Sequence, residues 1–228
     1  MTKRILVASL GLALLAGSLA LQAREFLFEA KGDYYLFTND TTKQIYKHGS
    51  GTFTAEVSAQ LMDNCCDNCC NSCWSQWYGW VSGGYLRKKG HVKDTLGNTY
   101  KTKMSLIPLG IGLKYLMPSC WGDFYLGAGL LIARIKTHDD SPFVQPNRDK
   151  WGAGFIVKGG FLWDFCNCWF VDLFADYSFI RIKFHDTTIA GPIYDSQHRI
   201  IGSGGFLEGH KANASGFGLG LGIGYRFN

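Results

Sequence analysis

The sequence predicts an all-β fold, namely an eight-stranded, antiparallel, up-and-down transmembrane β-barrel. The first reason is composition: aromatic residues make up 15% of the chain and 29 of its 228 residues are glycine, which favours strands and tight turns over helices. The second is that eight segments alternate apolar and polar residues, as two-faced strands do. The third is that the links between them alternate between long and short, as in outer-membrane barrels with long external loops and short periplasmic turns.

Residues 1–23 are expected to be a secretory signal peptide, because Lys3 and Arg4 precede an apolar run that is followed by small residues. An anchor that stays attached would have the same pattern. Residues 24–228 are then expected to form the barrel as one domain. Removal of Lys3 and Arg4 lowers the formal net charge from +5 to +3, which is too small to indicate a nucleic-acid partner. After the signal no run of 18 apolar residues occurs, which excludes a helical membrane protein.

The first two strands are expected at 26–37 and 52–61. In the first, Glu29, Lys31 and Asp33 alternate with apolar side chains or glycine. The second has one uniformly polar face, formed by Thr52, Thr54, Glu56, Ser58 and Gln60. Each segment is long enough for a tilted strand to cross a bilayer, which takes about 9–11 residues.

Six more strands are expected near 76–86, 103–115, 123–136, 152–165, 169–183 and 215–227. The segment 76–86 is rich in aromatics and glycine but has no clean alternation, and it is the weakest of the set. Eight strands is the smallest usual number for a membrane barrel, and it is even, which leaves both chain ends on the periplasmic side. Long links are expected at 38–51, 87–102, 137–151 and 184–214, and shorter ones at 62–75, 116–122 and 166–168.

The last strand indicates which face meets the lipid. In "SGFGLGLGIGYRFN" large apolar residues alternate with glycine and Arg226. A nearly bare face would be a poor surface in water and would weaken the strand. Inside a narrow barrel, the same bare face leaves room for charged groups from other strands. The apolar face is therefore expected to point into the bilayer, the reverse of a soluble barrel that buries its apolar face.

The inward charges are expected to pair with one another, because an unpaired charge is costly to bury. The predicted network in the lumen consists of Glu29, Lys31, Glu56, Lys158, Asp172, Asp176 and Arg226. Eight strands leave an interior just wide enough for side chains or one small ligand. We therefore expect a lumen plugged by ion pairs and not a wide aqueous pore.

Pro108 lies inside the fourth predicted strand. Proline cannot donate to a ladder, and a closed barrel has no free edge on which to place it. A local irregularity of the wall is therefore expected at this residue. It is either a bulge that only bends the strand or a lateral exit through which an apolar ligand reaches the bilayer.

Several stretches resemble the OmpW-like family of eight-stranded outer-membrane barrels. "SLIPLGIGLKYLMP" resembles its fourth strand, "DFYLGAGLLI" its fifth and "GLGIGYRF" its C-terminus. The alternating strand that ends with Tyr225 and Phe227 is similar to the assembly signal of outer-membrane proteins, although here Asn228 follows the last aromatic residue. The resemblance implies a small barrel that passes or binds small hydrophobic compounds.

Eight cysteines fall in or beside the three short links. They are Cys65, Cys66, Cys69, Cys70, Cys73, Cys120, Cys166 and Cys168. An exported protein meets oxidising conditions, in which thiols tend to pair. Three interpretations stay open: disulfides that include bonds to other envelope proteins, disulfides within the chain, and a metal site in "CCDNCCNSC". The cysteine usage resembles the disulfide-linked envelopes of chlamydia-like bacteria.

No motif indicates an enzyme. "GLGLGIG" does not open a helix, as a dinucleotide site requires, and no pair of serine and histidine residues has a recognised catalytic spacing. No cofactor is expected. The sequence predicts a porin-like barrel in the bacterial outer membrane with a structural role in the cell envelope, its partners being the lipid bilayer and disulfide-linked envelope proteins. The alternative is passive transport or binding of small hydrophobic solutes.

Overall fold

The computed structural model describes residues 25–46, 49–63, 76–93, 99–139, 147–165, 168–183, 187–188, 192–194, 200–203, 206–207 and 211–227. The predicted signal peptide lies outside these residues, as do Cys65, Cys66, Cys69, Cys70, Cys73 and Cys166. Within the part of the chain that the structure describes, no helix is long and apolar enough to cross a membrane.

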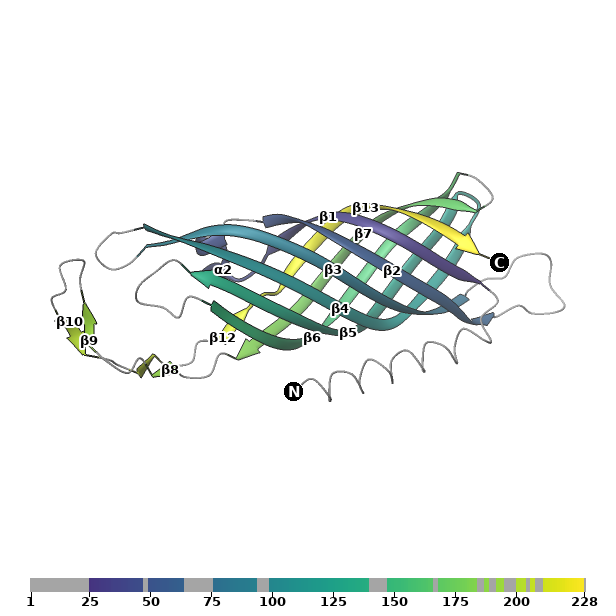
Figure 1. Ribbon diagram of the computed structural model, residues 1–228. Helices are drawn as coiled ribbons and strands as arrows, with labels where there is room; N and C mark the ends of the chain where they lie inside the picture. The colour runs from purple at the N-terminus through teal and green to yellow at the C-terminus, as the bar shows by residue number, and fades with distance from the viewer. Residues whose placement is uncertain are drawn as a thin grey trace.

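The molecule is a closed barrel of eight antiparallel strands (Figure 1). These are β1 (Phe26–Phe37), β2 (Gly49–Asp63), β3 (Gln76–Lys93), β4 (Thr99–Ser119), β5 (Gly122–Asp139), β6 (Asn147–Asp164), β7 (Trp169–Lys183) and β13 (Gly216–Phe227). Each strand pairs with its neighbour in this order, and β13 pairs with β1 to close the wall. The predicted fold class is confirmed, and all eight predicted strands occur.

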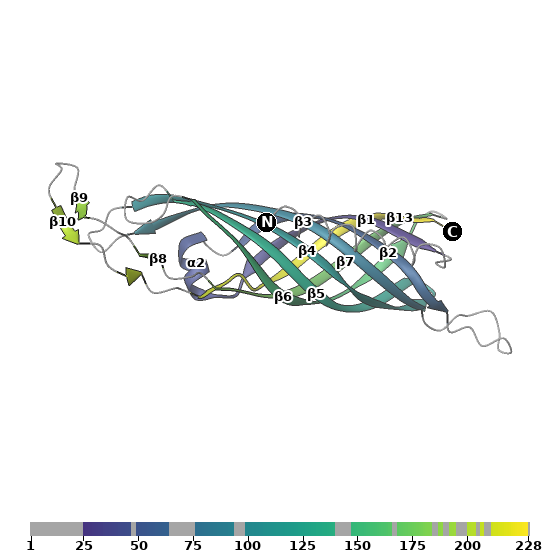
Figure 2. The same ribbon diagram turned by 60° about the horizontal axis from the view of Figure 1, so that its bottom comes forward.

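Smaller elements occupy the end of the barrel opposite the C-terminus (Figures 1 and 2). Helix α2 (Asp40–Tyr46) lies between β1 and β2. The link from β7 to β13 contains β8 (Thr187–Thr188), β9 (Pro192–Tyr194), β10 (Ile200–Ser203), β11 (Phe206–Leu207) and β12 (Lys211–Asn213). Of these, β12 continues the ladder along β7.

Two of the predicted long links are mostly strand, so those predictions are wrong. The β3–β4 ladder continues to the pair Lys93 and Thr99, and the β5–β6 ladder continues to His138 and Asn147. The physical reason is that the ladder depends on backbone pairing, which continues after the side chains have become polar. The predicted link 116–122 is also shorter, because β4 runs to Ser119 and β5 begins at Gly122, which has a φ of 140°.

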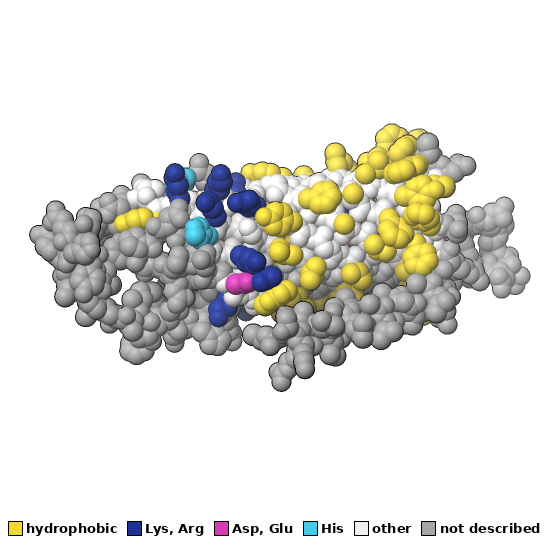
Figure 3. All heavy atoms as spheres, in the orientation of Figure 1, with side chains coloured by type: hydrophobic (Ala, Val, Ile, Leu, Met, Phe, Trp, Pro, Cys, Tyr) yellow, Lys and Arg dark blue, Asp and Glu magenta, His cyan; other side chains and the backbone are white. Residues whose placement is uncertain are grey.

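The polarity of the barrel is inverted relative to that of a soluble protein. Leu126 and Leu130 are apolar, yet 61% and 69% of their surface is exposed, whereas Lys114 and Asp172 are completely buried. On the face that Figure 3 shows, apolar side chains gather in a band over the part of the barrel nearer the C-terminal end of β13. A bilayer requires this arrangement, and it agrees with the face that the last strand predicts.

The glycines of β13 make room for inward side chains of its neighbours. A Cβ atom at Gly216 would lie 2.4 Å from the ring of Tyr35, and one at Gly224 would lie 2.2 Å from the ring of Phe170. Tyr35 and Phe170 are both buried. The bare face of the last strand therefore faces a filled lumen.

We predict that Leu130→Arg lowers the free energy of unfolding in bilayers by about 2–4 kcal/mol, the usual cost of arginine on the lipid face at mid-depth. The same substitution at Trp121, in the turn between β4 and β5, should cost about 0–1 kcal/mol. Urea unfolding from vesicles, followed by tryptophan fluorescence, measures both. Equal costs at the two positions would contradict the placement of the apolar band in lipid.

Candidate functional site

The candidate site is the lumen, which is filled in successive layers. The inward residues of β1 mark these layers from the C-terminal end of the barrel toward α2: Leu27, Glu29, Lys31, Asp33, Tyr35 and Phe37. Leu27 belongs to an apolar layer, Glu29 and Lys31 to a charged cluster, Asp33 to a cavity, and Tyr35 and Phe37 to a second apolar layer.

The charged cluster contains three lysines and three carboxylates: Glu29, Lys31, Glu56, Lys114, Lys158 and Asp172. All six are 5% exposed or less. Equal numbers of cations and anions make the cluster neutral, as burial in a low-dielectric interior requires.

The lysine amino groups join the carboxylates of different strands. Lys31 Nζ lies 2.7 Å from Glu29 Oε2 and 2.8 Å from Asp172 Oδ2. Lys114 Nζ lies 2.7 Å from Glu29 Oε1 and 3.0 Å from Glu56 Oε1. These contacts connect β1, β2, β4 and β7 across the lumen.

Lys158 extends the cluster to β6. Its Nζ lies 2.6 Å from Glu56 Oε2 and 3.4 Å from the centre of the Trp80 ring, so a cation–π contact covers its other side. The Tyr125 hydroxyl donates to Asp172 Oδ2 at 3.0 Å. Besides the carboxylates, the aromatic side chains of Trp80 and Tyr125 contact charged groups of the cluster.

An apolar layer lies between this cluster and the end of the barrel where β13 terminates. It consists of Leu27, Tyr78, Leu116, Tyr125, Leu162, Phe170 and Phe174. Beyond it, Arg226 contacts the carboxylates of Glu25, Asp123 and Asp164, at 3.4, 2.9 and 3.4 Å.

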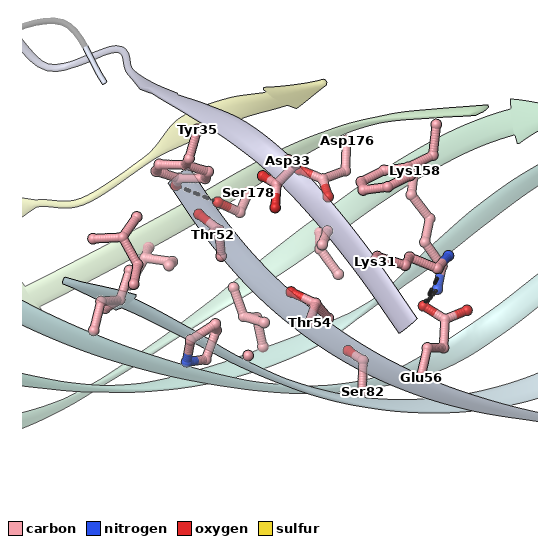
Figure 4. A pocket seen from close by; sticks show the side chains of 18 of the residues that line it. Lys31, Asp33, Tyr35, Thr52, Thr54, Glu56, Ser82, Lys158, Asp176 and Ser178 are labelled. Atoms are coloured by element: carbon pink, nitrogen blue, oxygen red, sulfur yellow. Dashed lines mark hydrogen bonds and ion pairs between the residues drawn. The ribbon is translucent and has the colours of Figure 1, made fainter. Parts of the chain in front are cut away.

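On the other side of the charged cluster lies a cavity of about 70 Å³ (Figure 4). Asp33 and Asp176 line it, and a Cβ atom at Gly218 would lie 2.8 and 2.6 Å from their oxygens. Among the residues that the structure describes, neither carboxylate makes an ion pair. The volume is enough for several water molecules or a small solute.

The second apolar layer closes the cavity toward α2. It contains Tyr35, Phe37, Tyr46, Leu86, Met104, Leu106, Leu131, Ala133, Ile135, Ile180 and Ala214. Tyr46 belongs to α2, so the helix contributes to this closure. Tyr35 donates a hydrogen bond of 2.8 Å to the Ala214 carbonyl, which satisfies its buried hydroxyl.

Pro108 lines the cavity beside an interruption of the β3–β4 ladder. Pairs form at Gly83 with Leu109 and at Leu86 with Leu106, and none of the described residues between them pair across these two strands. The β4–β5 ladder is continuous past Pro108, which pairs with Ala133. The interruption is thus confined to one side of the proline.

Of the seven residues predicted as an ion-pair network, the structure brings five together: Glu29, Lys31, Glu56, Lys158 and Asp172. Asp176 lies in the cavity and Arg226 at the end of the barrel, apart from the cluster. The network prediction missed Lys114. Phase alone puts Lys114 on the inward face, because it follows Gly110 and Gly112 at every second residue of an apolar segment, but phase does not show which charges it meets.

Two of the eight cysteines are described. Cys120 is exposed in the turn between β4 and β5, and Cys168 precedes β7; both are free thiols. Within the described ranges no group of three metal-ligating side chains is close enough to hold a metal ion. Near this end, the rings of Tyr225 and Phe227 contact each other with centroids 4.4 Å apart.

No family model matches the chain, and no curated protein matches its sequence. Among solved structures, the chain is similar to the outer-membrane protein OprG of Pseudomonas aeruginosa, with 14% identity, a TM-score of 0.59, and coverage of 90% of this chain and 97% of OprG. It is less similar to Ail of Yersinia pestis, at 12% identity, a TM-score of 0.46, and coverage of 89% and 98%. It is also less similar to the N-terminal barrel domain of OprF from P. aeruginosa, at 14% identity, a TM-score of 0.41, and coverage of 90% of this chain and 98% of that domain.

The likeness to OprG shows a shared fold, that of an outer-membrane β-barrel. Together with the apolar band on the exterior, this fold agrees with the location that the sequence predicts, the bacterial outer membrane.

We predict that Lys114→Met destabilises the folded barrel by about 3–5 kcal/mol, because it leaves two buried carboxylates short of a cation. Adding Glu29→Gln to the same chain should recover part of this loss, since the remaining charges balance again. The midpoint of urea unfolding in vesicles measures these two variants and Glu29→Gln alone. A double variant whose loss equals the sum of the single losses would show that Lys114 and Glu29 do not act as a pair.

Proposed function

We propose that the protein is a structural barrel of the outer membrane, with a closed lumen and with cysteines at its periplasmic end that form disulfides. The observation that supports this most is the filled lumen. The charged cluster joins β1, β2, β4, β6 and β7 across the interior, and apolar layers lie on both sides of it. An ion would have to break a buried network to pass through.

The orientation belongs to the same proposal. β13 ends at the same end of the barrel as the β4–β5 turn and the β6–β7 link, whereas α2 lies at the opposite end (Figure 1). Short turns face the periplasm in outer-membrane barrels. We therefore assign the C-terminal end of β13 to the periplasm and the end with α2 to the outside.

The cysteines support an attachment role at the periplasmic end. Cys120 is exposed in the short turn there and has no disulfide, so its thiol is accessible to another chain. In the sequence, Cys65, Cys66, Cys69, Cys70 and Cys73 lie between β2 and β3, and Cys166 lies between β6 and β7. Disulfides form in the oxidising envelope, which makes this end suited to cross-links with neighbouring envelope proteins, as in a cysteine-rich cell wall.

We predict that the protein in isolated envelopes migrates on non-reducing electrophoresis as a ladder that collapses to one band on reduction. Cys120→Ser should remove at least one step of this ladder, and Leu130→Ala serves as a control that leaves the thiols intact. In planar bilayers the purified barrel should give no stable single-channel currents. Steady currents, or a single band without reductant, would argue against the structural role.

A second candidate function is the binding or passage of a small hydrophobic solute. The observation that favours it is the cavity next to the interrupted ladder at Pro108. On this proposal the solute would pass between β3 and β4 at the interrupted ladder and so avoid both apolar layers. The solute would enter sideways, and the lumen would stay closed along its axis.

We predict for this candidate that vesicles containing the barrel take up indole faster than empty vesicles, and that Pro108→Val removes most of the difference. Valine supplies the backbone N–H that proline lacks and so allows the ladder to close. The matched control is Ile107→Val, which changes the neighbouring residue but not the ladder. Equal uptake by all three barrels would exclude a role for the interruption.

A further inference from the structure

The outer surface of β3, β4 and β5 changes from apolar to basic within a few outward positions along each strand, while the corresponding outward residue of β6 is Asp149. Leu109 on β4 pairs with Ile132 on β5 in one outward row. In the next outward row, Ile107 pairs with Arg134. The following outward row runs through Arg87, Ser105, Lys136 and Asp149. After it come Lys89, Lys103 and His138. Figure 3 shows Lys and Arg side chains gathered directly beside the apolar band.

A groove of about 530 Å³ lies on this basic surface, lined by Arg87, Lys103, Lys136, His138 and Asp149 among others. Its one acidic residue is already occupied, because Arg134 donates two hydrogen bonds to the carboxylate of Asp149. Among the described residues, Arg87, Lys103 and Lys136 have no ion-pair partner. The groove therefore presents an excess of positive charge.

We propose that this groove binds the phosphate groups of the glycolipid that forms the outer leaflet. The inference goes beyond the structural role and rests on the orientation proposed above. Lipid headgroups lie where the apolar band ends, and the basic rows begin there. Arginine and lysine are the side chains that bind phosphate best, as forked donor and as point charge.

The spacing of the cations favours a lipid with more than one phosphate. Arg87 and Lys136 share one row and are separated by β4, so their strands lie about 10 Å apart. A headgroup with two phosphates can place one phosphate at each side chain, whereas a single phosphate would need both side chains to lean toward one point. A sulfated polysaccharide would also carry many charges, but nothing in its chemistry would place its site at the edge of the apolar band.

The test compares two variants of the full chain, each lacking two positive charges. The groove variant is Arg87→Gln with Lys136→Gln, and the control is Lys150→Gln with Arg181→Gln, whose residues lie outside the groove. Each barrel is titrated in detergent with fluorescent diphosphoryl lipid A and with the same lipid after removal of its phosphates. Heat-dependent electrophoretic migration checks that both variants are folded.

The groove variant should bind diphosphoryl lipid A about 30-fold more weakly than the unaltered chain, as expected for two basic residues near anionic headgroups. The control should change the affinity less than about threefold, and removing the phosphates should weaken binding to the unaltered chain about as much as the groove variant does. Equal weakening in both variants, or no effect of the phosphates, would overturn the proposal. Displacement of the lipid by a lower concentration of heparin fragment would assign the groove to a polysaccharide instead. Channel currents would refute the structural role without changing this titration.

Discussion

The structure depends on one constraint: hydrocarbon offers no hydrogen bonds, so every backbone polar group that crosses the bilayer must find its partner within the wall. The pairing of β13 with β1 meets this constraint by removing the last free edge. Closure also separates two surfaces of opposite polarity. Leucine and phenylalanine can face outward only because the charged residues have an enclosed interior in which to pair.

The narrow interior explains how the charges and glycines are distributed. Three lysines and three carboxylates fit in one cross-section because neighbouring strands contribute little bulk there; Gly222, for example, lies against the Lys31 side chain. The cluster is neutral, so its burial costs less than that of any member alone. Asp33 and Asp176 lie in the next layer toward α2, where they line the cavity and make no ion pair with the residues that the structure describes. The cavity thus lies between the balanced cluster, whose Lys31, Glu56 and Lys158 line one side of it, and the second apolar layer.

Much of this could be predicted from the sequence because alternation and phase are local properties. Glycine at every second residue of the last strand indicated its inward face, and the phases of Glu29, Lys31, Glu56, Lys158 and Asp172 put them inside the barrel. Which inward charges meet depends on how far each strand is shifted along its neighbour, and alternation does not specify that shift. For this reason Lys114 was missed, and Asp176 and Arg226 were grouped with residues that lie in other layers.

The long links were misjudged for a related reason, and it has a functional consequence. The alternation of apolar residues shows which part of a strand lies in lipid. The hydrogen-bonded ladder shows where the strand itself ends. In β3 to β6 the ladder extends beyond the apolar alternation. Strands of 18 to 21 residues are about twice as long as a bilayer requires. The surplus holds Arg87, Lys103 and Lys136 on a paired sheet and not on a loop, so their positions relative to the apolar band are fixed by the ladder. A rigid basic surface at the membrane boundary loses little conformational entropy on binding, and the extended strands provide this property at no cost to the closure of the barrel.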